Sequence, residues 1–119
     1  MAYRGSLPTS MFNDRQVRAK DFAKWRHATS KLARGRDRDT VDRYKAEIER
    51  GGLKKPIWLD VSDRTGWVYI GDGHHRAVAL LELGVVDFDF HWRLTSKGGW
   101  FSQPPLESDP FPYRLLGVA

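Results

Sequence analysis

The sequence predicts a single small α+β domain, because two hydrophobic periods occur along one short chain. Apolar residues recur every three or four positions in three segments, which is the period of a helix, and alternate in three others, which is the period of a strand. A hydrophobic content of 40% over 119 residues is enough for one compact core. The predicted order is helix, helix, strand, strand, helix, strand and an irregular tail.

The N-terminal part is predicted to be an extended arm followed by a basic helix. Residues 1–16 show no sustained period, whereas residues 17–35 place Phe22, Trp25, Thr29 and Leu32 on one helical face, with Gly35 as the stop. Basic residues fall on the opposite face or continue the series, and six of them are predicted to contact nucleic acid: Lys20, Lys24, Lys31, Arg34, Arg36 and Arg38. A solvated basic face with no partner explains the same pattern equally well.

The next segment predicts a second helix and a β-hairpin. Asp39 or Thr40 caps the helix, which buries Val41, Tyr44 and Ile48 and ends at Gly51-Gly52. Residues 57–61 then alternate as a strand, residues 63–66 have turn chemistry, and residues 67–71 alternate again. The two strands are therefore expected to pair as a hairpin.

The C-terminal part predicts a third helix, a strand and a tail. A helical period runs from His74 to Gly84, and residues 86–94 alternate strictly between apolar and polar side chains. Residues 97–119 are rich in proline and are predicted to be irregular. The aromatic residues of this tail either cover an edge of the core or contact a protein partner: Trp100, Phe101, Phe111 and Tyr113.

The charge distribution points to a polyanionic partner. Residues 1–55 hold 15 Lys and Arg against 7 Asp and Glu, while residues 56–119 hold 5 against 8. Such an asymmetry favours nucleic acid, DNA first, over an anionic membrane.

The absence of cysteine excludes disulfides, cysteine-ligated zinc and thiol catalysis. No apolar run is long enough to span a bilayer, so we expect a cytoplasmic protein without a membrane partner.

The segment Gly71-Asp72-Gly73-His74-His75-Arg76 joins the second strand to the third helix, and it predicts an anion site. The first N–H groups of a helix are unpaired and lie at the positive end of its dipole. Glycines let a ligand approach the backbone, and His75 and Arg76 add donors suited to phosphate. A tight turn alone would also need the glycines, and Arg76 can instead pair with Asp72 or Asp60. Metal binding is not expected, since adjacent histidines chelate poorly and no HxxxH spacing occurs.

The stretch "IGDGHHRAVALLELG" resembles the signature of the ParB/sulfiredoxin superfamily. The pattern G-x-x-R-x-x-A-x-x-x-x-G is met by Gly73, Arg76, Ala79 and Gly84, and "KKPIWLDV" resembles the strand before it. The resemblance covers about residues 38–94 of the single domain expected over residues 1–119. It implies a small mixed sheet with a helix before the hairpin and a motif-bearing helix after it. The basic helix and the irregular tail lie outside it.

The resemblance implies a nucleotide or phosphate pocket, with CTP or ATP and Mg²⁺ as possible cofactors. Its residues would be Gly71, Gly73, His75 and Arg76 of the turn, with Thr40 and Arg43 of the preceding helix. The nucleophilic cysteine of sulfiredoxin would fall at His74, so that reaction is excluded. We expect a stand-alone domain of a phage or plasmid type, rather than a full partition protein.

Three functional hypotheses follow. The first is a ParB-like domain that binds nucleotide or phosphate and associates with DNA. The second is an enzyme with the same pocket, a nuclease, NTPase or phosphotransferase, in which Asp72 or His74 acts as base and Asp60 assists. The third is an interaction or inhibitor module that has lost the ligand and binds a protein through its tail. The sequence does not indicate the oligomeric state.

Overall fold

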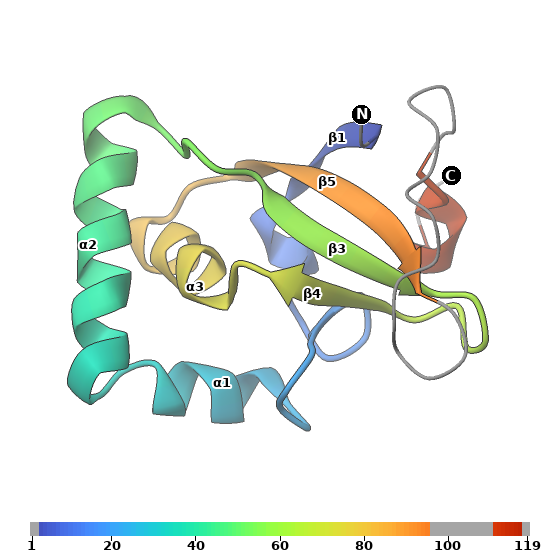
Figure 1. Ribbon diagram of the computed structural model, residues 1–119, viewed down its shortest axis with the longest axis horizontal. Helices are drawn as coiled ribbons and strands as arrows, with labels where there is room; N and C mark the ends of the chain where they lie inside the picture. The colour runs from blue at the N-terminus through green and yellow to red at the C-terminus, as the bar shows by residue number, and fades with distance from the viewer. Residues whose placement is uncertain (1–2, 96–110, 118–119) are drawn as a thin grey trace.

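The computed structural model describes residues 3–95 and 111–117, which fold around one five-stranded mixed sheet (Figure 1). The strand order is β1-β5-β3-β4-β2. The strands are β1 (Tyr3–Pro8), β2 (Val17–Ala19), β3 (Ile57–Ser62), β4 (Val68–Asp72) and β5 (Asp87–Thr95). The helices are α1 (Trp25–Lys31), α2 (Gly35–Gly51) and α3 (His74–Leu83), with short 3-10 turns η1 (Thr9–Met11) and η2 (Tyr113–Leu116).

The sheet combines one hairpin with three long-range pairings. The β3–β4 hairpin is antiparallel, as the sequence predicts. The chain returns through α3, so β5 lies parallel to β3 on the side away from β4. At the two edges, β1 pairs antiparallel with β5 and β2 pairs parallel with β4. Both edge strands therefore come from the first 19 residues of the chain.

One face of the sheet forms the core together with α3. Alternation places Ile57, Leu59 and Val61 of β3 on this face, fully buried, as expected from the sequence. Phe88, Phe90 and Trp92 of β5 are buried on the same face, and this strand was predicted to within one residue at each end. The buried side chains of α3 belong to the same cluster, which places the start of this helix firmly against the sheet.

The prediction of an extended N-terminal arm is wrong. Residues 3–8 form β1, and the buried Leu7 joins the core. The Thr9 hydroxyl then donates to the Val85 carbonyl at 2.6 Å, across 76 positions of sequence. Such pairing depends on backbone hydrogen bonds to distant strands, so a short segment without clear alternation gave no signal of it.

The prediction of one helix over residues 17–35 is also wrong. Residues 17–19 form β2, and helix α1 begins only at Trp25. The Trp25 indole donates to the buried Val17 carbonyl at 2.8 Å, which folds the helix back against β2. Within α1, Trp25 and Ala28 are buried, while Thr29, predicted to face the core, is exposed.

Helix α2 begins earlier than predicted, at Gly35 rather than at Asp39 or Thr40. Gly35 has a φ of +60°, which separates α2 from α1, so this glycine opens a helix instead of stopping one. Asp37 in the first turn complements the helix dipole. The predicted end at Gly51-Gly52 is confirmed, and Gly52 has a φ of +82°.

The C-terminal tail is only partly described. Trp100 and Phe101 lie outside the described residues. Phe111 is buried and contacts Phe90 and Trp92 edge to face, with ring centroids 4.9 and 5.5 Å away. This aromatic residue therefore covers the core edge formed by β5.

Within the described residues, no helix combines the length and apolar character that crossing a bilayer requires.

The start of α1 provides a test of the revised N-terminal structure. The Asp14 carboxylate accepts the Trp25 backbone N–H at 2.7 Å and so caps α1 from outside the helix. We expect Asp14→Ala to lower the free energy of unfolding by about 1 kcal/mol, the usual cost of a lost cap. Asp39→Ala is the control and should change it by less than about 0.5 kcal/mol. Urea denaturation measures both, and a larger loss for Asp39→Ala would contradict the helix boundaries described here.

Candidate functional site

The turn between β4 and α3 leaves the start of α3 open. Gly73 is the N-cap residue, with a φ of +118° that disfavours any other residue type. No side chain caps the helix, and its first turn contains no acidic residue. The first N–H groups of a ten-residue helix are thus left for an external acceptor, at the positive end of the dipole. This geometry suits an anion.

Arg76 supports the turn from beneath. Its residue exposure is only 5%, and its Nη1 donates to the carbonyls of Lys55 at 3.0 Å and Pro56 at 2.9 Å. Its Nη2 lies 3.2 Å from the Asp72 carboxylate, which is one of the two pairings that the sequence left open. The guanidinium therefore joins α3 to the segment before β3. In this arrangement the Arg76 guanidinium makes its hydrogen bonds to other groups of the protein.

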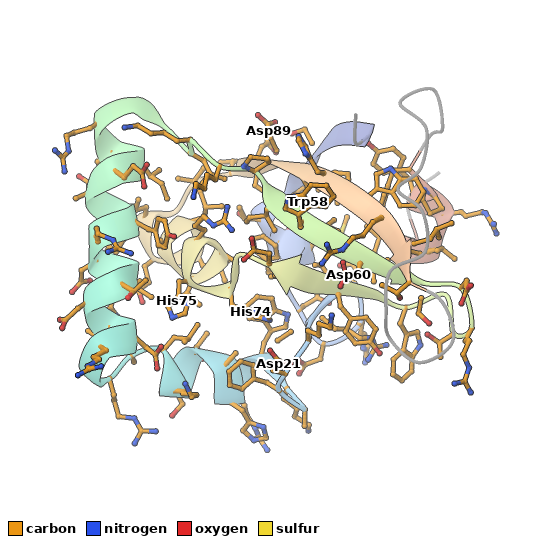
Figure 2. The ribbon with its side chains drawn as sticks, viewed as in Figure 1. Asp21, Trp58, Asp60, His74, His75 and Asp89 are labelled. Atoms are coloured by element: carbon orange, nitrogen blue, oxygen red, sulfur yellow. The ribbon has the colours of Figure 1, made fainter. Side chains whose placement is uncertain are left out.

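His75 lies at the meeting point of the three helices (Figure 2). Its Nε2 is 2.9 Å from Asp37 Oδ1 in the first turn of α2, and Lys31 of α1 donates to the other oxygen of Asp37 at 3.0 Å. The hydrogen bond from His75, then that from Lys31, lowers the pKa of Asp37 below its ordinary value of 3.8. Both His75 and Asp37 are partly exposed, so a ligand can reach this pair.

His74 is held in its neutral form. Its Nε2 accepts the backbone N–H of Lys20 at 3.0 Å, and its ring packs edge to face with Phe22. Burial is the main cause that lowers the pKa of His74 below 6.5. Since Nε2 is an acceptor in the neutral ring, the proton resides on Nδ1. A role as general base would therefore require the bond to Lys20 to break.

Gly71 makes room for a buried carboxylate. Asp60 of β3 is 2% exposed, and it pairs with Lys20 at 3.0 Å and with Arg93 of β5 at 2.6 Å. A methyl group at Gly71 would overlap the Asp60 carboxylate. Gly71 therefore serves the ion pairs of Asp60, in the strand that leads to the turn.

The two residues predicted on α2, Thr40 and Arg43, have their described contacts within that helix. The Thr40 hydroxyl donates to the Arg36 carbonyl at 3.0 Å. Arg43 lies 5.5 Å from the centroid of the Tyr44 ring, and Arg76 lies 5.9 Å from the same centroid. Because α2 begins at Gly35, both residues are beyond its first turn. Asp37, which the sequence analysis did not select, is hydrogen-bonded to His75 of the turn.

The six predicted nucleic-acid contacts divide into two groups. Three form ion pairs: Lys20 with Asp60, Lys31 with Asp37, and Arg38 with Asp42 and Glu82. The others are exposed, and within the described residues they form no ion pair: Lys24, Arg34 and Arg36. Lys20 follows β2 and is not part of the helical stripe in which it was predicted.

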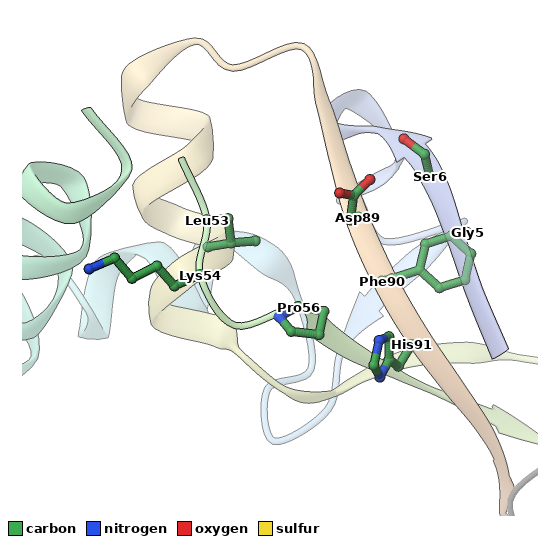
Figure 3. A pocket seen from close by; sticks show the side chains of 8 residues that line it. All are labelled: Gly5, Ser6, Leu53, Lys54, Pro56, Asp89, Phe90 and His91. Atoms are coloured by element: carbon green, nitrogen blue, oxygen red, sulfur yellow. The ribbon is translucent and has the colours of Figure 1, made fainter. Parts of the chain in front are cut away.

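Two hollows in the surface lie beside the turn rather than in it. One of about 570 Å³ lies between β1, β5 and the segment before β3, with Ser6 and Asp89 at one side and Pro56 at the other (Figure 3). The second, of about 450 Å³, lies beside β2 and the start of β4. Neither of these two is lined by residues 71–76.

Metal ligands are not clustered in the described part of the chain. There, no group of three or more His, Asp or Glu side chains is arranged to hold an ion. A Mg²⁺ ion at the turn would thus depend on ligand phosphates for much of its coordination, which is common for nucleotide sites.

Comparisons with known proteins support the fold. No family model matches the chain, and no curated protein is significantly similar to it. Among solved structures, the crystal structure of sulfiredoxin from Arabidopsis thaliana matches with a TM-score of 0.54 and 22% sequence identity. The match covers 78% of this chain and 86% of the sulfiredoxin chain. The chain therefore has the α+β, sulfiredoxin-like fold that the sequence predicts, and at this identity the likeness extends to the fold alone.

The packing of Gly71 against Asp60 gives a prediction. We expect Gly71→Ala to lower the free energy of unfolding by about 2 kcal/mol, because the added methyl group forces the carboxylate away from its partners. Gly51→Ala is a matched control, since a Cβ at Gly51 would meet nothing within 4 Å. It should not lower stability, and can raise it by up to about 1 kcal/mol, because alanine restricts the unfolded chain. Equal effects of the two substitutions in urea denaturation would refute the proposed crowding at Gly71.

Proposed function

We propose that this chain is a nucleotide- and phosphate-binding domain with a sulfiredoxin-like fold, and that it associates with DNA. The observation that carries the proposal is the open N-terminus of α3, which has no capping side chain and no acidic residue in its first turn. Backbone N–H groups at such a position bind phosphate with help from the helix dipole. CTP and ATP, each with Mg²⁺, are the ligands to test first.

His75 and Lys31 are the side chains that would join the backbone in holding phosphate. Both now donate to Asp37, whose ionised carboxylate takes the place of an anion beside the turn. A bound phosphate would accept from the same two donors and displace Asp37. Arg76 would act as a positioning residue, because it holds α3 against the segment before β3.

The neighbouring helices provide the proposed DNA contact. Lys24, Arg34 and Arg36 are exposed near the ends of α1 and α2 and have no ion pair among the described residues. These three cations are therefore the best candidates to contact phosphates of the DNA backbone, with little sequence readout. An enzymatic role gains no comparable support. In His74, Nδ1 carries the proton and Nε2 accepts the Lys20 N–H, so neither nitrogen is free to act as a base.

The nucleotide proposal is tested by calorimetry with ATP, CTP, ADP and GTP, each with Mg²⁺. We expect at least one to bind saturably, and His75→Ala to weaken that binding about tenfold through loss of a charge-assisted hydrogen bond. His27→Ala replaces an exposed histidine of α1 and should leave binding unchanged. If the folded wild-type protein binds none of the four nucleotides, the turn is structural only.

The DNA proposal is tested by the salt dependence of binding to duplex DNA, measured by fluorescence anisotropy. Each lost phosphate contact makes the slope of log K against log salt shallower by about 0.9, so Arg34→Gln with Arg36→Gln should reduce it by about 2. The matched control is Arg50→Gln with Arg64→Gln, two exposed cations at the far end of α2 and in the turn between β3 and β4. An identical slope for both double variants would remove Arg34 and Arg36 from the interface.

A further inference from the structure

The outer sheet face, opposite the core, carries aromatic rings and cations instead of the small polar side chains usual on a solvated sheet. Register partners place Arg93, Asp60, Tyr69 and Arg18 in one row across β5, β3, β4 and β2. Trp58 lies beside this row on β3 (Figure 2). None of α1, α2 and α3 passes over β3 and β4 on this side (Figure 1). Within the described residues, this face is therefore not covered by a helix.

The cations of the outer sheet face gather at its β2 edge. Exposed Asp87 and Asp89 lie toward the opposite edge, on β5. Asp60 is 2% exposed and lies beneath its two cationic partners. Lys20 covers it with a side chain that is 40% exposed, so the cation and not the carboxylate meets the solvent. Arg18 adds a further cation in β2. Two cations thus face a ligand at this edge, where they can pair with anionic groups.

Arg18 and Trp67 contact each other at the β2 edge of this face. The Arg18 guanidinium lies 3.9 Å from the centroid of the Trp67 ring, a cation–π contact. Trp67 is nevertheless 48% exposed, and the Tyr69 ring centroid is 6.3 Å from that of Trp67. Arg18 has no ion pair with a described residue, and its buried Nε has no hydrogen-bond acceptor. Because Nε is buried, a ligand with anionic oxygens would bind the Nη groups of Arg18.

A hollow of about 450 Å³ opens at the same place, within the size range of ligand sites. Trp67, Tyr69, Arg18 and Lys20 all line it, so two aromatic rings and two cations converge on one space. Its remaining lining comes from residues that precede or follow β2: Asp14, Ala19, Asp21, Phe22 and Ala23. Two carboxylates therefore line the hollow as well: that of Asp14, which accepts the Trp25 N–H, and that of Asp21, which is exposed.

We propose that the outer sheet face binds single-stranded nucleic acid, with bases stacked on Trp67 and Tyr69 and backbone phosphates paired with Arg18 and Lys20. Aromatic platforms beside cations are the general means by which proteins hold single strands, because every base has a stacking face. The bases of a duplex are stacked on one another and cannot use such a platform. This inference does not depend on the phosphate site at α3, because it uses other residues on another surface.

Fluorescence anisotropy with labelled oligothymidylate and oligouridylate of about 12 nucleotides, a length typical of single-strand sites, tests the proposal. Trp67→Ala and Arg18→Gln should each weaken single-strand binding about tenfold. Trp67→Phe keeps a stacking ring and should restore binding to within about threefold of wild type. Trp67→Ala should alter binding to duplex DNA by less than about twofold. Photocrosslinking of bromouridine-substituted strands should label the peptide that contains Trp67 and Tyr69.

The controls separate this surface from the rest of the molecule. Val86→Ala replaces another exposed apolar residue and should leave single-strand binding unchanged. His75→Ala should also leave it unchanged, even where that substitution abolishes nucleotide binding. Circular dichroism establishes that each variant is folded. The proposal is overturned if no single strand binds, if Trp67→Ala and Arg18→Gln bind as well as wild type, or if only free nucleotides bind at Trp67.

Discussion

The carboxylate of Asp60 is the constraint on which the arrangement of this sheet depends. It is buried in the central strand β3. Lys20, which follows β2, and Arg93 of β5 both form ion pairs with it. A buried charge is costly unless it is paired, and the two cations pair with the two oxygens of this carboxylate. The ion pairs therefore link β5, β3 and the end of β2. Gly71 is needed in β4 because any larger residue would occupy the space of the carboxylate.

Lys20 connects this buried cluster to the candidate site. Its side chain binds Asp60, while its backbone N–H donates to His74 at the start of α3. The end of β2 is thereby joined both to the centre of the sheet and to the turn. Arg76 makes a comparable link on the other side, from α3 to the carbonyls before β3. Two cations thus fix the position of the turn, and neither is freely available to a ligand there.

The polar groups of the site thus divide into those that hold the turn in place and those that a ligand can contact. Lys20 and Arg76 shape the turn, whereas His75 and the open N–H groups of α3 remain partly exposed. The same principle applies on the outer sheet face, where Asp60 neutralises part of the charge and Arg18 has no anionic partner among the described residues. Within the described chain, each proposed surface thus contains donors without a side-chain acceptor: the first N–H groups of α3 at one, and the buried Arg18 Nε at the other.

The sequence by itself determined the central part of this protein. Local period and turn chemistry were sufficient for the β3–β4 hairpin, for α3 with glycines at both ends, and for β5, since these elements alternate strongly and lie next to one another in the chain. It also located the turn from Gly71 to Arg76. Only the tertiary structure decided the edge strands β1 and β2, because strands of three to six residues gain their stability from distant partners. The tertiary structure likewise decided which charged side chains form ion pairs and which remain exposed. Lys20 has a helical spacing to Lys24 in the sequence, but it pairs with the buried carboxylate of Asp60 in the sheet, and such an ion pair across 40 positions leaves no local pattern.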